Sequence, residues 1–282
     1  MAAENEDSER RRPLRQVFAR APFGETVSVE ELCRIAQRLG AVGVDAVSDP
    51  RDWPLLERYG LVCSLMRIDY GGGQSTMLPP PAPAGWGAIA LHQAQGDFLE
   101  ACVKGVQLAG QNGIPGVYLS CGSRLDVSSE VGADNAVAFL NQVKAEAEAC
   151  NVTLNIENMN SLGLFGPLES IFDRMAWGLD VVRRVASPRV KILYDIYHAQ
   201  LMEGNIVRTL RENVEWIGHI QVAGVPGRGP LDDDQELNFR YIGRAIAESG
   251  YTGFVGHEWH RPAEADPVEA MRRSMAVLDG LE

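Results

Sequence analysis

The stretch KILYDIYH, residues 191–198, carries the pattern that decides the fold. An apolar-rich run, Val190 to Tyr194, ends at Asp195, and His198 follows three residues later, where the sequence changes to a helical pattern. Polar side chains at the end of a buried strand are typical of enzymes built on a barrel of parallel strands. The stretch therefore predicts a strand that presents functional side chains at its end.

Three other segments repeat this arrangement. TLNIEN contains Glu157, WIGHIQVAG contains Gln221 and GFVGHEWH contains Glu258, and each stands where a short β-rich run changes to loop residues. In a barrel, the carboxyl ends of all parallel strands meet at one face. We therefore expect Glu157, Asp195, Gln221 and Glu258 to lie together at the ends of four successive strands.

Strand and helix patterns alternate along the chain. Eight such β/α units within 282 residues predict a single-domain α/β protein, a (β/α)8 TIM barrel. A doubly wound open sheet is the alternative, but the glycine-rich turn of dinucleotide-binding folds is missing. Besides the four strands above, strands are predicted near residues 15–19, 43–47, 62–68 and 116–120, and helices near residues 28–39, 53–59, 91–109, 133–149, 179–185, 206–213, 239–249 and 267–278.

Two segments fall outside this alternation. Residues 1–12, MAAENEDSERRR, are highly charged and contain no apolar core, so we expect a disordered tail ahead of a barrel that occupies residues 13–282. Residues 71–87 are too rich in glycine and proline for a helix or a central strand. Because the alternation resumes after them, they are expected to form a long surface loop, and such loops often cover a site.

Composition restricts the classes of partner. The net charge of −12 argues against a nucleic-acid partner, because phosphate binding requires clustered Lys and Arg, and the 45% hydrophobic content suits a large core. No apolar run approaches the length of a membrane span. The five cysteines are scattered and form no CxxC pair, which favours a reducing, cytoplasmic location. A small-molecule substrate is expected.

The four oxygen donors suit a hard divalent cation. Carboxylate and amide oxygens favour Mg²⁺ or Mn²⁺ over a softer metal that prefers thiolates. Without a cation, carboxylates held side by side repel and raise one another's pKa. The set therefore predicts a metal site.

Longer motifs resemble a known family. The runs YDIYHAQLMEGN (residues 194–205), HIQVAGVPGR (219–228), ELN (236–238) and GYTGFVGHEW (250–259) are similar to the hydroxypyruvate isomerase branch of the xylose isomerase-like TIM barrels. The resemblance extends from about residue 30 to the C-terminus and is most specific between residues 155 and 258. That superfamily also contains ketose epimerases, inositol-pathway isomerases and dehydratases, and abasic-site endonucleases.

The resemblance implies a site as well as a fold. A divalent metal would be held by Glu157, Asp195, Gln221 and Glu258, with manganese or magnesium as the expected ion and cobalt as an alternative. The resemblance makes Glu157 and Glu258 the catalytic acid and base as well, while the residues that match His198 and Arg228 contact substrate oxygens. Proton transfer next to a carbonyl through an enediolate needs an electrophile and a base, which a metal and two glutamates provide. Barrels of this family often form homo-oligomers.

Other functions remain open at this point. A lyase or dehydratase acting on a keto sugar, an inosose or a 3-keto glycoside would use the same metal site. An abasic-site endonuclease would need more metal-binding histidines and a basic groove, and a metal-free barrel could serve as a partner subunit. The loop after Glu157, ENMNSLGLFGPLES, lacks the proline and the Asp-x-Pro-Gly-Tyr stretch of the isomerase branch. A small hydroxycarbonyl compound or keto sugar is therefore expected, without a named substrate.

Structural roles compete with functional ones at these positions. Asp195 could cap the helix that follows it, and Glu157 and Glu258 could form salt bridges at strand ends. The remaining histidines near the motifs, His219, His257 and His260, are interpreted as structural residues, because no second histidine pair stands at metal-binding spacing.

Overall fold

The strands form a parallel barrel wall. The computed structural model describes residues 14–24, 26–47, 49–68, 89–90, 95–124, 127–162, 169–261 and 266–280. The strands within these residues are β1 (Arg15–Phe18), β2 (Gly43–Val44), β3 (Val62–Cys63), β4 (Met66–Arg67), β5 (Gly116–Leu119), β6 (Thr153–Glu157), β7 (Val190–Asp195), β8 (Ile217–Val222) and β9 (Phe254–His257). They make one sheet in the order β3-β2-β1-β9-β8-β7-β6-β5-β4, and every pair is parallel.

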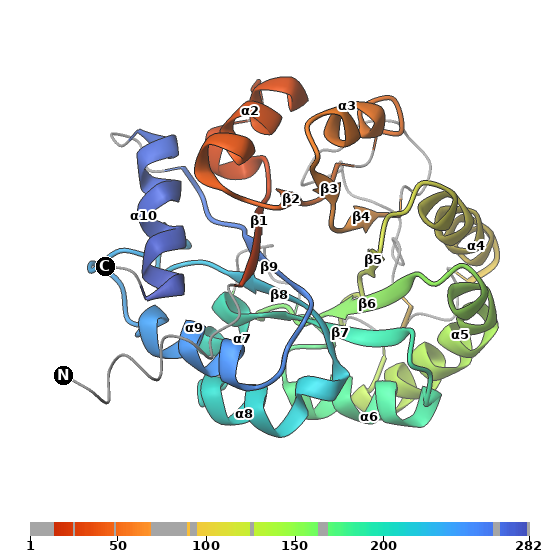
Figure 1. Ribbon diagram of the computed structural model, residues 1–282. Coiled ribbons are helices and arrows are strands. Elements are labelled where there is room, and N and C mark those ends of the chain that lie inside the picture. Colours follow the sequence, from red (N-terminus) through yellow and green to blue (C-terminus); the bar gives the residue numbers. More distant parts are fainter. Residues whose placement is uncertain are drawn as a thin grey trace.

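The third predicted strand closes the barrel. It is interrupted at Ser64 and Leu65, so that β3 pairs with β2 while β4 pairs with β5. The two ends of the sheet are therefore adjacent in the chain, and the strands form a ring in Figure 1. This interruption explains why nine strands stand where eight were predicted, because one segment pairs with two different neighbours. The predicted TIM barrel is confirmed.

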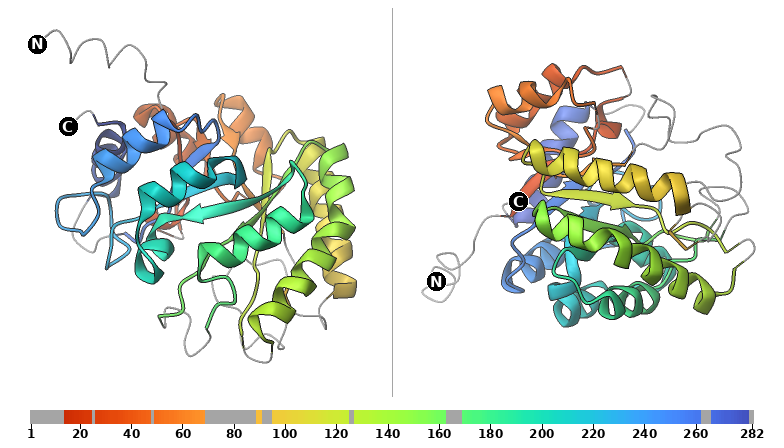
Figure 2. Two further views of the ribbon diagram at one scale, coloured as in Figure 1. Left: turned by 90° about the horizontal axis from the view of Figure 1, so that it is seen from below. Right: turned by 90° about the vertical axis from the view of Figure 1, so that its right-hand side faces the viewer.

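Helices cover the outside of this ring, as Figure 1 shows. The turned views in Figure 2 show α4 (Gln95–Gln111) and α5 (Ser129–Ala149) side by side along the barrel wall. The other helices of the described chain are α2 (Val29–Leu39), α3 (Trp53–Arg58), α6 (Met175–Val185), α7 (Ile196–Met202), α8 (Ile206–Asn213), α9 (Phe239–Glu248) and α10 (Pro267–Asp279), with short 3-10 turns η1 (Ala21–Phe23) and η3 (Val214–Trp216).

Capping side chains set the starts of two helices. The Ser28 hydroxyl accepts a hydrogen bond from the Glu31 backbone N–H at 3.2 Å, and α2 ends at Gly40, whose φ of 75° suits glycine. The Ser128 hydroxyl caps α5 in the same way, accepting from the Val131 N–H at 3.2 Å. As a result α5 begins four residues before its predicted start, because the cap lies ahead of the Ala-rich periodicity used to predict the helix.

Further expectations from the sequence concern the proposed tail and covering loop, the cysteines and the possibility of a membrane span. The proposed tail, residues 1–12, and the proposed covering loop, residues 71–87, lie outside the described residues. All five cysteines are unpaired, and four of them are buried. A search of the described helices found none that is both long and apolar enough to cross a membrane.

The contact between α9 and α10 provides a test of the outer layer. An ideal Cβ at Gly243 would lie 1.9 Å from the Leu278 backbone oxygen, so the helices approach closely only because glycine has no side chain there. We expect Gly243→Ala to lower the free energy of unfolding by about 1–3 kcal/mol in a denaturant titration. Arg240→Ala, at an exposed position of the same helix, should change it by less than about 0.5 kcal/mol. Equal effects from the two variants would contradict the close contact.

Candidate metal and active site

The four predicted oxygen donors lie at the carboxyl ends of four neighbouring strands. Glu157 and Asp195 are the last residues of β6 and β7, Gln221 is the penultimate residue of β8, and Glu258 directly follows β9. Asp195 pairs in register with Gln221, and Gln221 pairs with Gly256. The Glu258 backbone N–H then donates to the Val222 carbonyl at 3.1 Å, which extends the pairing by one residue. The structure therefore gathers the donors at one barrel mouth.

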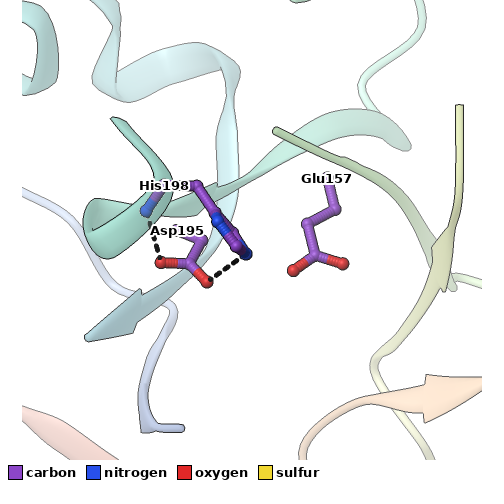
Figure 3. Close-up of side chains that lie close together, drawn as sticks. All are labelled: Glu157, Asp195 and His198. Carbon is purple, nitrogen blue, oxygen red and sulfur yellow. Dashed lines mark hydrogen bonds and ion pairs between the residues drawn. The ribbon is translucent and has the colours of Figure 1, made fainter. Parts of the chain in front are cut away.

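His198 joins this group from the first turn of α7. One potential ligand atom each from Glu157, Asp195 and His198 lies within 4.8 Å of the others. Figure 3 shows the Glu157 carboxylate directed toward the Asp195 carboxylate and the His198 ring. Both Asp195 and His198 are buried. Three residues from three elements, β6, β7 and α7, thus share one small volume.

Arg228 places a positive charge among these carboxylates. Its Nη2 lies 2.5 Å from Glu258 Oε2 and 3.2 Å from Asp195 Oδ2, and its Nε donates to the Glu258 carbonyl at 3.3 Å. The side chain is buried, and the backbone of Arg228 has a φ of 52°, in the left-handed region. The guanidinium fork, predicted to bind substrate, is largely engaged by protein oxygens here.

Burial and mutual repulsion dominate the electrostatics of the acids. Burial and then the charges of Glu258 and Asp195 raise the pKa of Glu157 well above its ordinary value, against a smaller lowering by Arg228. Burial also raises the pKa of Glu258 and of Asp195, with Arg228 opposing the shift in both. When all are ionised, three carboxylates and one guanidinium leave a charge of −2, so Arg228 neutralises only part of the repulsion.

Gln221 tests whether this set fits a cation. Its side chain is buried, and its Oε1 has no hydrogen-bond donor within the described residues. An unsatisfied buried acceptor is costly, and a metal ion is one partner that satisfies it. An orphaned amide oxygen beside three carboxylates with a residual charge of −2 fits a divalent cation. The residues that would hold it are Glu157, Asp195, Gln221 and Glu258.

Asp195 both caps helix α7 and faces the candidate site, the structural and functional roles considered for it above. Its Oδ1 accepts from the backbone N–H groups of Tyr197 at 2.8 Å and His198 at 3.3 Å, which caps α7. Its Oδ2 faces Arg228. The backbone of Asp195 is itself fixed by Asn158, whose side chain accepts from its N–H at 2.9 Å and donates to its carbonyl at 3.0 Å. Capping therefore orients the carboxylate and leaves one oxygen for the site.

The hydrogen bonds of Asn160 decide which ring nitrogen of His198 carries the proton. The Leu162 backbone N–H donates to Asn160 Oδ1 at 3.0 Å, so Asn160 Nδ2 faces His198 Nδ1 at 2.7 Å. Burial lowers the pKa of His198 well below its ordinary value, so the ring is neutral and its single proton lies on Nε2. Nε2 lies 3.4 Å from Asp195 Oδ2 and 3.3 Å from Arg228 Nη1. The second contact is not a hydrogen bond, because both nitrogen atoms carry protons. His198 is thus presented as a donor and not as a metal ligand.

Sequence reasoning missed several residues of this region. Asn158 and Asn160 fix Asp195 and His198, and the polar run ENMN after a strand end was the available signal. Tyr118 and Arg67, paired in register on β5 and β4, interact electrostatically with Glu157, and no motif marked them.

Two of the three histidines interpreted as structural have buried partners. His219 Nε2 lies 3.0 Å from Asp45 Oδ2, and His257 Nε2 lies 2.7 Å from Gln16 Oε1. His260 is exposed. Its backbone N–H donates to the Arg228 carbonyl at 2.7 Å, which helps to hold the loop that carries this arginine.

Known proteins share both the sequence and the fold. A human protein named "Putative hydroxypyruvate isomerase" is 32% identical over 204 residues, covering 66% of this chain and 67% of that protein. The 2-oxo-tetronate isomerase of Cupriavidus necator is 29% identical over 201 residues, covering 68% of this chain and 75% of that protein. The crystal structure of the 3-keto-D-glucoside 4-epimerase YcjR from E. coli superposes with a TM-score of 0.76 at 17% identity, covering 95% and 99% of the two chains.

A family model provides the broadest match. The model described as xylose isomerase-like TIM barrel matches residues 53–281, which includes β3 to β9 and every candidate site residue. The isomerase class predicted from the sequence agrees with the names of the matched relatives. Because sequence, strand order and relatives agree, this chain belongs to the xylose isomerase-like TIM-barrel family.

Proposed function

We propose that the protein is a divalent-metal-dependent isomerase of the hydroxypyruvate isomerase type, which moves a proton next to a carbonyl in a small hydroxycarbonyl or keto-sugar substrate. The observation that carries the proposal is the group of donors from β6 to β9, in which the Gln221 oxygen has no partner among the described residues. The names of the relatives support this reaction class. Manganese or magnesium is the proposed ion.

The two glutamates are proposed to exchange the proton. Each can hold the ion through one carboxylate oxygen and exchange a proton with the substrate through the other. Glu157 and Glu258 come from β6 and from the end of β9, with the β7 and β8 donors between them, so they can approach a substrate from two sides. One glutamate, in its ionised form, removes a proton from carbon, and the other, in its protonated form, donates its own proton to the neighbouring carbon of the enediolate.

The remaining residues orient the substrate. A bound divalent cation would supply the Lewis acid that polarises the substrate carbonyl. His198, with its proton on Nε2, donates to a substrate oxygen, and Asn160 keeps it in that tautomer. Arg228 offers Nη1 to a second oxygen while Nη2 stays on Glu258 and Asp195. A lyase remains the second candidate, because loss of a β-substituent from the same enolate needs the same groups.

Isotope exchange tests the reaction class. With hydroxypyruvate or a 2-oxo-tetronate in deuterated water and Mn²⁺ present, proton NMR should show deuterium entering the carbon next to the carbonyl without loss of water. Glu258→Gln should reduce the turnover by a factor of about 10²–10⁴, because the amide cannot accept the proton. Glu248→Gln, at an exposed position of α9, should leave it unchanged. Full activity in Glu258→Gln would contradict its role, and loss of water would favour the lyase.

The orphaned oxygen of Gln221 gives a test of the metal site that needs no substrate. Gln221→Leu should leave the metal-free protein at least as stable, because it removes an unsatisfied buried acceptor, yet Mn²⁺ should bind about tenfold or more weakly. Gln16→Leu is the matched control, since both ends of that buried amide are bonded, to His257 and to the Met275 carbonyl. It should destabilise by about 1–3 kcal/mol without changing Mn²⁺ affinity. Unchanged affinity in Gln221→Leu would remove this residue from the ligand set.

The raised pKa of Glu157 predicts how Mn²⁺ binding depends on pH. A carboxyl whose folded-state pKa is raised favours the folded protein while protonated, and this stabilisation is lost as the pH rises through the raised pKa. Mn²⁺ requires the ionised form, so its affinity should keep increasing as the pH rises above the ordinary pKa of a glutamate, 4.5, and binding should release protons. Calorimetry in buffers of different ionisation enthalpy measures the release, which should decrease in Glu157→Gln. An Mn²⁺ affinity that levels off at the ordinary carboxyl pKa would contradict the raised pKa.

A further inference from the structure

A cavity of about 450 Å³ opens at the opposite end of the barrel. Its lining includes the first residues of several strands, among them Arg15 of β1, Gly116 of β5, Thr153 of β6 and Phe254 of β9. The proposed metal ligands lie at the carboxyl ends of β6 to β9, and none of them lines this cavity. Its volume falls in the range that holds small ligands in proteins.

Positive charge collects at this mouth although the chain carries −12 overall. Arg15, Arg189 and Lys191 line the cavity, and Glu215 is the one acid among the described lining residues. Within the described chain, no carboxylate lies within ion-pair distance of these three cations. Their hydrogen-bond partners are neutral oxygens of Thr252, Asn151 and Glu215, the last through its backbone carbonyl. With Glu215 counted against the three cations, the described lining carries a charge of +2.

A buried acceptor at the same place also lacks a partner. Asn155 is only 2% exposed, and its Nδ2 donates to the carbonyls of Val117 and Thr153, each at 3.2 Å. Its Oδ1 has no donor among the described residues. This oxygen lies beside Gly218, where an ideal Cβ would be 2.3 Å away, and both residues line the cavity. Because Gly218 has no side chain, Asn155 Oδ1 can lie close to it without a hydrogen-bond donor.

We infer that this cavity binds a small hydroxy acid. The carboxylate of the ligand pairs with Arg15, Arg189 and Lys191, and its hydroxyl donates to Asn155 Oδ1. Ser64 and His219 also line the cavity, and both are hydrogen-bonded to Asp45 inside the barrel. The inference concerns residues outside the candidate active site and does not depend on the proposed function.

Calorimetry with two matched acids tests the site. The full chain is freed of metal with a chelator and titrated with L-malate and with succinate, which differs by lacking the hydroxyl. Malate should bind at one site per chain, about fivefold more tightly than succinate, and more weakly as salt is added. No detectable malate binding would overturn the inference, and equal affinities for the two acids would overturn the role of Asn155.

Variants locate the binding. Arg189→Gln combined with Lys191→Met should weaken malate binding about tenfold or more. Lys144→Met is the control, because Lys144 also donates to a backbone carbonyl, that of Val185 at 3.1 Å, but lies outside the cavity. Thr153→Glu places a negative charge in the lining and should abolish binding, which covers the case in which the double variant is poorly folded. Malate binding unchanged in Thr153→Glu would overturn the inference, whether or not the isomerase assay succeeds.

Discussion

Three carboxylates from Glu157, Asp195 and Glu258 meet at one mouth of the barrel, and each makes the others harder to ionise. Burial strengthens this effect, because solvent screens the charges of buried groups less than those of exposed ones. Arg228 compensates part of the charge through contacts to two of the acids. A divalent cation would neutralise the rest and provide a partner for the Gln221 oxygen. The repulsion among the carboxylates is therefore unfavourable when no cation is bound, and a cation with two positive charges would remove it.

The side chains around this group restrict its geometry. Asp195 uses one oxygen to cap α7, so the strand end, the helix start and the direction of the other oxygen are fixed together. Asn158 bonds both polar groups of the Asp195 backbone, and Asn160 holds the His198 ring from behind. A site positioned in this way keeps its donors in place before substrate arrives, which lowers the entropic cost of reaching the reactive geometry.

The two ends of the barrel carry opposite charge. Acids gather at the carboxyl ends of β6 to β9, while arginine and lysine line the cavity at the amino ends. Alternation along a strand puts Asn155 and Glu157 on the same face of β6, and His219 and Gln221 on the same face of β8. Each of these two strands therefore contributes a polar residue to the cavity at its amino end and an oxygen donor to the candidate metal site at its carboxyl end. The barrel can thus offer separate sites to two ligands of different charge.

The local pattern of the sequence was enough for the fold, and it indicated the four candidate donors. Hydrophobic periodicity reports which residues face a core, so the alternation and the polar residues at strand ends were visible without coordinates. The helix start at Ser129 lies ahead of its predicted position because the capping residue, Ser128, stands outside the periodic region. The interruption at Ser64 and Leu65 could not be predicted, since it arises from pairing one segment with both ends of the sheet.

Contacts between distant segments were decided only by the tertiary structure. They include the approach of Arg228 to Glu258 and Asp195, the fixing of the His198 tautomer by Asn160, and the absence of a partner for Gln221 Oε1 among the described residues. Residues 30 or more positions apart meet there, and no short-range pattern encodes such distances. The sequence by itself determined which side chains stand at strand ends. Closure of the barrel decided which of them meet, because only a closed sheet brings those ends around one space.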